Sequence, residues 1–140
     1  MTSLRNTRNK AMEAKELMVG DKVLVKVLSQ IPETYVPHTW CEEDYTRNLQ
    51  VMPIPLTAEI LEKNGAICNY GIWFFEKNVF ESASFWYCYG NEDYMSDEAN
   101  EYFGGHWVFD DNYRIDYVHE LQHALHLCGL TELAENFKVE

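Results

Sequence analysis

Basic residues are scarce in this sequence of 140 residues. It contains 11 Lys and Arg against 23 Asp and Glu, which gives a formal net charge of −12 at pH 7. An acidic surface repels the phosphates of nucleic acids and the headgroups of anionic lipids. We therefore expect neither nucleic acid nor a membrane as the partner of this protein.

Long apolar runs are also absent. The opening stretch MTSLRNTRNK is polar and basic, unlike the apolar core of a secretory signal. No later run reaches the roughly 20 apolar residues that a membrane-spanning helix needs. These features predict a soluble, cytoplasmic protein.

The sequence has few cysteines, and they form no recognisable pattern. Its four cysteines, Cys41, Cys68, Cys88 and Cys128, are irregularly spaced and include no C-x-x-C pair. Nothing else in the sequence indicates an oxidising compartment. The spacing therefore predicts reduced thiols that are buried as small apolar residues.

Common catalytic signatures are missing as well. The sequence has no G-x-G-x-x-G motif, no Walker loop and no G-x-S-x-G elbow, and nothing in it places a histidine beside a cysteine. Gly104-Gly105 is predicted to be an ordinary loop pair. The acidic residues between 91 and 104 lack the spacing of a calcium loop and predict a solvated loop. They are Glu92, Asp93, Asp97, Glu98 and Glu101.

Apolar residues, by contrast, are plentiful enough to build a core. Hydrophobic residues make up 46% of the chain and aromatic residues 14%. A chain of this length with that supply favours one domain that folds without disulfides. We expect a single domain over residues 1–140, with a flexible tail over 1–12.

Local patterns predict both strands and helices. Val23, Val25 and Val27 alternate with other side chains after a turn, which is typical of a half-buried strand. Thr57 can cap a helix AEILEKN that stops at Gly65. Residues 29–50 predict one or two short strands within a loop, residues 66–89 predict two or three antiparallel strands, and residues 106–109 predict another. A last helix is expected from about 115 to 128.

These elements lack a β-α-β rhythm, so the expected fold class is α+β. We expect an antiparallel sheet of three to five strands packed against the carboxy-terminal helix and the short central helix at 57–65. A small amino-terminal strand element, from 17 to 55, would lie at its edge and could close into a partial β-barrel.

The closing helix contains the H-E-x-x-H pattern of zinc hydrolases. His119 and His123 are one helical turn apart, and Glu120 between them could act as a general base. A third ligand would have to come from His126, His106 or a carboxylate between 92 and 101. One alternative function is therefore a zinc-dependent hydrolase that uses His119-Glu120-Leu121-Gln122-His123.

The helical wheel favours a structural explanation of the same pattern. The three histidines cluster on one side of the helix, and an apolar stripe of Tyr117, Leu121, Ala124 and Cys128 lies opposite. We expect this stripe to face the core and the histidines to face solvent. On that basis the sequence assigns no catalytic, cofactor-binding or metal-binding residue, and no cofactor is expected.

Four stretches resemble a known protein family. They are AKELMVGDKVLV, MPIPLTAEILEKNGA, the segment from IWFFEKN to FWYCYG, and IDYVHELQHALHLCGLTEL. In this order they resemble small, uncharacterised proteins of Bacteroidetes genomes and of their phages and mobile elements. The family patterns are a P-I-P-L-T-E-E-x-L-x-K-x-G helix and a carboxy-terminal Y-V-H-x-L-Q helix. The chain departs from them at residues 29–50 and 91–104.

The resemblance bears on the zinc pattern. The family usually has Gln and Asn at the positions of Glu120 and His123, which implies that it does not depend on a metal there. It implies structural roles for Tyr117, Leu121 and Gly129 and provides no catalytic residue to carry over. The resemblance therefore implies a phage or mobile-element accessory protein.

The aromatic strands point to protein contacts. Trp73, Phe75, Phe85, Trp86, Tyr87, Tyr89 and Trp107 lie in strands whose alternate side chains face opposite ways. One face can pack under the closing helix. The other either carries exposed rings, as partner-binding patches do, or is covered in turn by the rest of the chain.

The sequence thus predicts a non-enzymatic protein-binding or accessory module whose partner it does not identify. A zinc-dependent hydrolase is the first alternative. The second is a nucleic-acid-binding module built on the strand element after Gly20, which the acidic composition disfavours.

Overall fold

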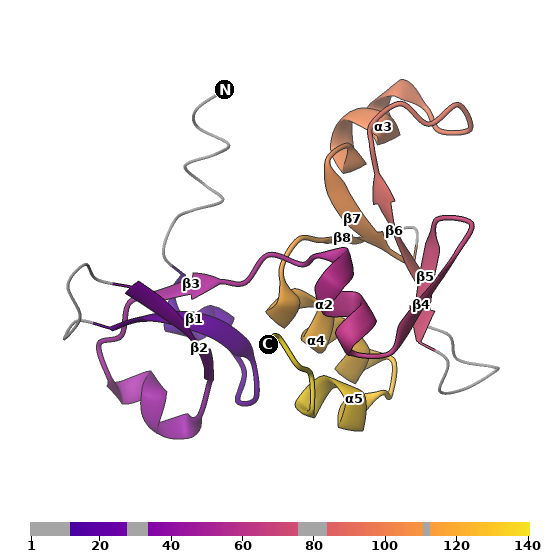
Figure 1. Cartoon of the computed structure of the whole chain (residues 1–140). Helices are drawn as coiled ribbons and strands as arrows, with labels where there is room; N and C mark the ends of the chain where they lie inside the picture. Colours follow the sequence, from indigo (N-terminus) through magenta and orange to yellow (C-terminus); the bar gives the residue numbers. More distant parts are fainter. Residues whose placement is uncertain (1–11, 28–33, 76–83, 111–112) are drawn as a thin grey trace.

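The chain folds into two antiparallel sheets with short helices around them (Figure 1). A computed structural model describes residues 12–27, 34–75, 84–110 and 113–140. The expected α+β class is confirmed. Residues 1–11 of the expected tail lie outside the described residues, as does Glu76-Lys77-Asn78, where the sequence indicates a turn between strands. Met12, also part of the expected tail, donates a backbone hydrogen bond to the Val51 carbonyl oxygen at 2.9 Å.

The amino-terminal sheet has three strands in the order β2-β1-β3. These are β1 (Lys22–Val27), β2 (Thr34–Thr39) and β3 (Val51–Pro53), accompanied by the 3-10 turns η1 (Ala14–Glu16) and η2 (Glu42–Thr46). Its own small core consists of Leu17, Val23, Trp40 and Val51. The strand expected around Val23 is confirmed, but the sheet is open and does not form a barrel.

The second sheet is a meander of five strands in sequence order. Its strands are β4 (Ala66–Asn69), β5 (Ile72–Phe75), β6 (Ser84–Cys88), β7 (His106–Phe109) and β8 (Tyr113–Ile115). The expected antiparallel strands over 66–89 and 106–109 are confirmed. The strand β8 is an addition, because residues 113–115 pair with β7 before the last helix begins.

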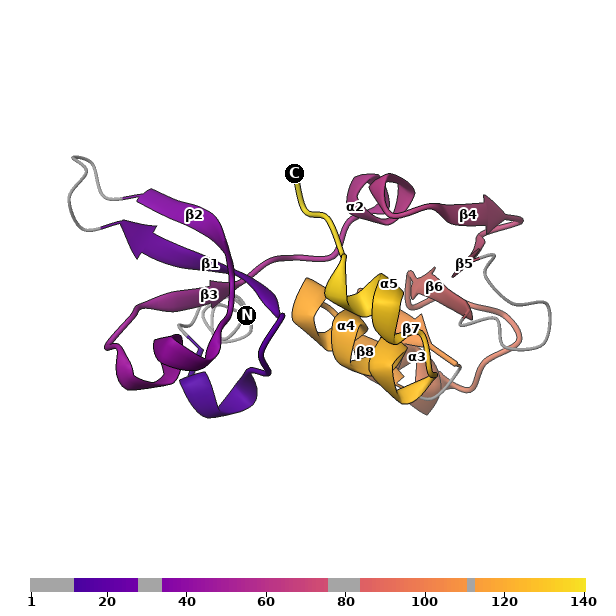
Figure 2. The ribbon, with the colours of Figure 1, turned by 90° about the horizontal axis from the view of Figure 1, so that it is seen from below.

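Three helices cover one face of this meander: α2 (Ala58–Lys63), α4 (Val118–Leu127) and α5 (Thr131–Glu135). Figures 1 and 2 show them between the two sheets. Leu61, Leu121 and Leu125 are fully buried from the helix side. From the sheet side the same core receives Phe75, Phe85, Phe109 and Ile115.

The central helix begins where the sequence predicts. The Thr57 hydroxyl accepts a hydrogen bond from the Ile60 backbone N–H at 3.2 Å, which satisfies one of the free donors of the first turn. Gly65 follows the helix with a positive φ of 84°, a conformation that glycine adopts without a steric penalty.

The solvated loop expected at 91–104 is wrong in part, since α3 (Asp97–Phe103) lies within it. Ser96 caps this helix by accepting from the Ala99 N–H at 3.1 Å, and Asp97 and Glu98 stand in its first turn. None of its residues is buried, so it has no apolar stripe for a sequence pattern to reveal. Only the Ser96 cap indicates this helix in the sequence.

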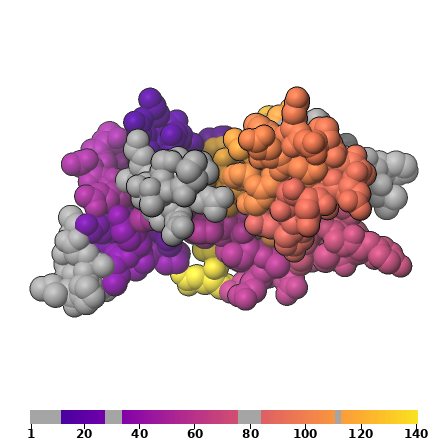
Figure 3. Space-filling model, turned by 90° about the horizontal axis from the view of Figure 1, so that it is seen from above, coloured from indigo at the N-terminus to yellow at the C-terminus, as the bar shows by residue number. Residues whose placement is uncertain are grey.

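Gln122 of α4 connects the amino-terminal sheet to the helices that cover the five-stranded sheet. Its side chain is 1% exposed, and its Oε1 accepts from the Lys22 backbone N–H at 2.8 Å. Its Nε2 donates to the carbonyl oxygens of Gly20 and Ala134, each at 2.9 Å. Figure 3 shows the indigo and purple amino-terminal part at one end of the molecule and the orange part at the other.

Candidate functional site

The histidines of the H-E-x-x-H pattern lie at the junction of the two sheets. His119 is 6% exposed, and His123 Nε2 lies 2.7 Å from Oδ2 of the buried Asp21. The expectation that these imidazoles face solvent is therefore wrong. A helical wheel assumes one buried face, whereas α4 packs against its own sheet on one side and against β1 on another.

His119 behaves as a buried neutral ring. Burial lowers its pKa to about 4, although the nearby Asp21 carboxylate acts in the opposite direction. Its ring lies nearly parallel to that of Tyr117 at a centroid distance of 6.1 Å. Its Nδ1 has no hydrogen-bond partner among the described residues. These contacts are those of a packed aromatic side chain.

Glu120 is engaged at the start of its own helix. Its Oε1 accepts from the backbone N–H groups of Asp116 at 2.9 Å and Tyr117 at 3.0 Å, as in a capping box. Burial raises the pKa of this carboxyl, and the two hydrogen bonds act against that rise. One oxygen of this carboxylate is therefore engaged at the amino terminus of α4.

The remaining metal candidates are not brought together. Among residues 12–27, 34–75, 84–110 and 113–140, no three His, Cys, Asp or Glu side chains are placed to hold a metal ion. His106, one proposed third ligand, instead has its Nδ1 2.7 Å from Asp116 Oδ1. Leu121 of the motif is fully buried in the core.

The structure does bring one histidine and one cysteine to a shared group, contrary to expectation. The buried Asp44 Oδ2 lies 2.7 Å from His38 Nε2 and accepts from the Cys41 backbone N–H at 2.8 Å and from its Sγ at 3.1 Å. Desolvation favours a higher pKa for Asp44, yet these hydrogen bonds lower the pKa to about 2. The same carboxylate raises the pKa of the Cys41 thiol, which opposes formation of a nucleophilic thiolate.

The four thiols are free, as the spacing predicts. Their predicted burial holds for Cys88 alone, because Cys68 is exposed and Cys41 and Cys128 are half-buried. Cys68 lies in β4 at the edge of the meander, where an apolar position can still face solvent.

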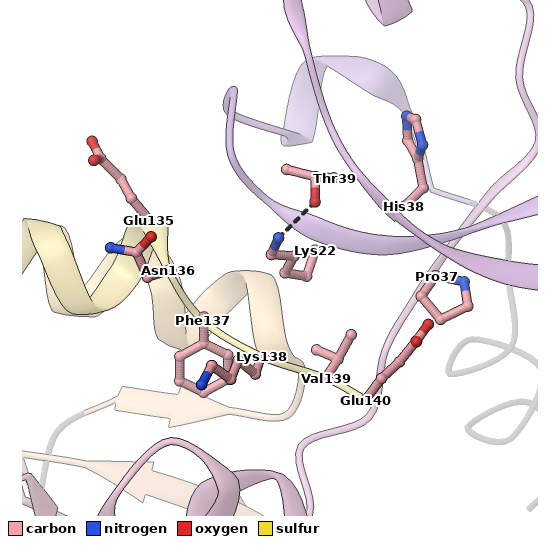
Figure 4. A pocket seen from close by; sticks show the side chains of 10 residues that line it. All are labelled: Lys22, Pro37, His38, Thr39, Glu135, Asn136, Phe137, Lys138, Val139 and Glu140. Carbon is pink, nitrogen blue, oxygen red and sulfur yellow. Dashed lines mark hydrogen bonds between the residues drawn. The ribbon is translucent and has the colours of Figure 1, made fainter.

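A hollow of about 410 Å³ lies between the amino-terminal sheet and the segment after α5. Figure 4 shows lining side chains from β1, β2 and residues 135–140. Lys22 Nζ donates to Thr39 Oγ1 at 2.6 Å, and the charges around the hollow are mixed, because Lys22 and Lys138 line it together with Glu135 and Glu140. This mixture of positive and negative side chains does not indicate any one class of ligand.

A larger hollow lies in the five-stranded sheet between the tip of the β4–β5 hairpin and the end of β6. It has a volume of about 700 Å³. We call it the aromatic groove; its lining consists of Trp73, Trp86, Tyr87, Tyr89, Tyr94, Trp107, Ala58, Cys68, Tyr70, Gly71, Ile72 and Glu92. Seven of these twelve lining residues are aromatic, so the hollow is mainly an aromatic surface.

The groove forms where strands β5 and β6 diverge. The described ladder between β5 and β6 consists of the pairs Trp73↔Phe85 and Phe74↔Ser84. Toward the tip of the β4–β5 hairpin the ladder has no further pair, although β6 continues to Cys88 alongside β7. The hairpin and the end of β6 therefore form the two walls of the groove.

Its floor is fixed by contacts with the core. Trp107 Nε1 donates to the Leu56 carbonyl oxygen at 3.0 Å. The ring of Trp107 meets Tyr87 edge-on at 5.4 Å and Trp73 at 6.3 Å between centroids. These perpendicular arrangements are the favoured ones for aromatic pairs, and they hold the floor rings in place.

One wall is the hairpin tip, where Tyr70 takes an unusual conformation. The pair Asn69↔Ile72 closes a two-residue turn made of Tyr70 and Gly71, whose φ angles are 53° and 81°. Positive φ at both positions is the type I′ pattern, which favours Asn-Gly and disfavours a bulky first residue. The Tyr70 side chain is also 99% exposed. The ring is thus almost fully exposed and occupies a backbone position that is unfavourable for a bulky residue.

The opposite wall continues from the end of β6 into the loop that follows it, and Asn100 of α3 clamps this loop. Asn100 Oδ1 accepts from the Glu92 N–H at 2.9 Å, and its Nδ2 donates to the Glu92 carbonyl at 3.0 Å. Glu92 Oε2 accepts from the Tyr89 N–H at 3.1 Å. The clamp places the Tyr94 ring 6.2 Å from that of Trp86.

Sequence reasoning found the aromatic strands but not the groove. Of the rings it named, Phe75, Phe85 and Trp107 are buried, whereas Tyr89 is 75% exposed. It missed Tyr70 and Tyr94, which lie in turns outside the strands. The signal for Tyr70 was the N-Y-G sequence, in which an aromatic residue occupies a position that usually holds Asn.

Comparison of the chain with protein-family models, with curated proteins and with solved structures finds no match. Within the described part of the chain, no helix has the length and apolar character to cross a bilayer.

Proposed function

We propose that this chain is a non-enzymatic protein-binding module, an accessory protein of the phage or mobile-element type, and that it binds its partner in the aromatic groove. The observation that supports this proposal is the exposure of tyrosines around one hollow: Tyr70 is 99%, Tyr89 75% and Tyr94 74% exposed. Tyrosine and tryptophan are enriched in the energetically dominant parts of protein interfaces.

The lining of the groove is better suited to binding a polypeptide than to catalysing a reaction. The described residues of this lining include one acidic side chain, Glu92, and no histidine, lysine or arginine. General acid–base catalysis normally needs at least a titratable pair held at hydrogen-bonding distance. Rigid rings with polar tips instead provide contact area at a small cost in conformational entropy.

The experiment is affinity capture from a host lysate with matched variants. Tyr89→Ala combined with Tyr94→Ala removes two groove rings, and Tyr113→Ala removes a 63% exposed ring on β8 as the control. We expect a partner that the wild type and the control retain and that the groove variant loses. A partner retained equally by all three proteins would place the interface elsewhere.

The captured protein is then titrated against chain labelled with ¹⁵N at its four tryptophan indoles. Trp73 and Trp86 line the groove, whereas Trp40 belongs to the core of the amino-terminal sheet and serves as an internal control. Binding in the groove shifts the first two indole signals and leaves the Trp40 signal in place. Shifts confined to Trp40 would contradict the proposal.

A further inference from the structure

The aromatic groove adjoins a second hollow with a strong acidic character. This hollow has a volume of about 480 Å³. Its lining comprises Gly90, Asn91, Glu92, Asp93, Met95, Asp97, Asn100 and Glu101. Glu92 belongs to both hollows, so the aromatic lining passes directly into the acidic one.

Among the described residues that line the two hollows, none is a basic side chain that would compensate these carboxylates. Asp93 and Glu101 are exposed, and the chain as a whole carries a formal net charge of −12. A partner that enters this region therefore gains electrostatically if it is cationic, and an acidic partner is repelled.

The rings of the groove favour the same sign of charge. The face of a tyrosine or tryptophan ring attracts a lysine or arginine cation placed over it. The molecule already contains one such contact outside the groove, in which the Arg114 guanidinium lies 4.2 Å from the Tyr102 ring centroid. The exposed rings of Tyr70, Tyr89 and Tyr94 offer further faces of this kind.

The walls favour an extended ligand. One wall is the β4–β5 hairpin and the other is the end of β6, and the described ladder between β5 and β6 stops at the pair Trp73↔Phe85. A segment lying between two diverging strands can run parallel to them and meet backbone as well as rings, as in strand addition. A globular surface would not reach the floor ring of Trp107, which is 8% exposed.

We infer that the groove binds an extended, basic polypeptide segment of its partner, with Lys or Arg side chains over the exposed tyrosines and beside the carboxylates of the acidic hollow. This inference rests on the proposed function and specifies the partner's chemistry. It follows from the juxtaposition of an open aromatic groove with an uncompensated acidic hollow that shares Glu92 with it.

The test uses the full chain with ¹⁵N-labelled indoles and three synthetic peptides of equal length. The first alternates arginine with threonine, and the others carry glutamine or glutamate in place of arginine. We expect the arginine peptide to shift the Trp73 and Trp86 signals without moving Trp40. Binding should weaken severalfold when the salt concentration rises from about 0.1 M to about 1 M, because the Debye length shrinks to about 3 Å.

Two double variants test whether the acidic hollow is responsible for binding of the arginine peptide. Asp93→Asn with Glu101→Gln removes two exposed carboxylates of the acidic hollow, and we expect severalfold weaker binding of the arginine peptide. Glu132→Gln with Glu135→Gln makes the same change of net charge on α5, at two exposed positions outside both hollows, and should leave binding nearly unchanged. Equal weakening by both pairs would reduce the effect to overall charge and overturn the inference.

The other outcomes separate this inference from the proposed function. Equally tight binding of the glutamine or glutamate peptide would overturn the basic partner and leave groove binding standing. Indole shifts that grow with protein concentration alone would identify a second copy as the occupant and overturn it as well. If no peptide moves the signals, the extended basic segment is ruled out, and affinity capture with the tyrosine variants still decides the proposed function.

Discussion

His123 Nε2 and Asp21 Oδ2 lie 2.7 Å apart across the junction of the two sheets. The Asp21 carboxylate is almost fully buried and also accepts from the Met18 backbone N–H at 2.8 Å. One half of the apparent zinc motif is thus part of the contact between α4 and the turn before β1. The proposed role of this helix is therefore architectural, and its consequences can be measured.

Replacement of His123 should lower stability. His123→Ala leaves the buried Asp21 carboxylate without its side-chain partner, so we expect the free energy of unfolding to fall by about 1–3 kcal/mol. His126→Ala, one turn further along α4, should change it by less than about 0.5 kcal/mol. Urea denaturation of the three proteins measures both effects.

The zinc alternative makes a prediction about the metal content of a double variant. A motif that holds zinc would lose stoichiometric metal on His119→Ala with His123→Ala, as measured by elemental analysis of the purified protein. We expect the metal content to be the same before and after the substitutions. Bound zinc that disappears with them would reinstate the hydrolase.

Stability should fall in weakly acidic solution because of His119. Burial holds the pKa of His119 at about 4 in the folded chain, against an ordinary value of 6.5. The unfolded chain therefore binds a proton first as the pH falls, and stability present above about pH 6.5 is lost progressively toward pH 4. The loss attributable to this group is at most about 3 kcal/mol.

His119→Phe keeps a buried ring and removes the titration. Urea denaturation between pH 7 and pH 4 should show a shallower decline for this variant than for the wild type. Asp21 and His123, which act on the same ring, are present in both proteins, so the difference between the two curves isolates His119. Parallel curves would contradict the assignment.

Tyr70→Asn should separate stability from binding. The substitution creates Asn-Gly in a turn whose φ angles are 53° and 81°, and this dipeptide is the preferred one for such a turn. We expect the free energy of unfolding to rise by about 1 kcal/mol, because strain of that order is relieved. Partner binding should weaken, because an exposed ring of the groove is lost.

The measurement pairs thermal unfolding with capture of the partner. Tyr113→Asn, at an exposed strand position, should give no such gain in stability and no loss of partner. If Tyr70→Asn instead lowers the free energy of unfolding, the tyrosine ring stabilises the fold by more than the strain of its turn destabilises it.

Gly104→Ala should disrupt the wall of the groove formed by the loop that Asn100 clamps. Gly104 has an ordinary φ, but an added Cβ would lie 2.6 Å from the Asn100 carbonyl oxygen and 3.0 Å from Gly90 Cα. Backbone must move to relieve this contact, at an expected cost of about 1–3 kcal/mol. We expect the Trp86 indole signal to shift with the loop, while the Trp40 signal stays in place. Two unchanged signals would contradict the close approach.

The same residue shows why tertiary contacts escape a sequence pattern. Gly104-Gly105 appeared to be an ordinary loop pair, yet Gly104 approaches Gly90 closely where two loops meet. The Thr57 cap and the strand around Val23 depend on neighbours in sequence, and both were predictable. The aromatic groove was only partly predictable, because strands reveal which rings exist but not where two strands diverge.

The sequence by itself determined the α+β class, the capped central helix, the antiparallel meander and the supply of aromatic rings, because each depends on local periodicity or on neighbouring residues. Only the tertiary structure decided that His119 and His123 lie inside the junction and that Tyr70 and Tyr94 stand on opposite walls of one groove. The physical reason is that burial depends on everything packed around a residue. A helix that touches two sheets has two buried faces, whereas its sequence displays only one apolar stripe.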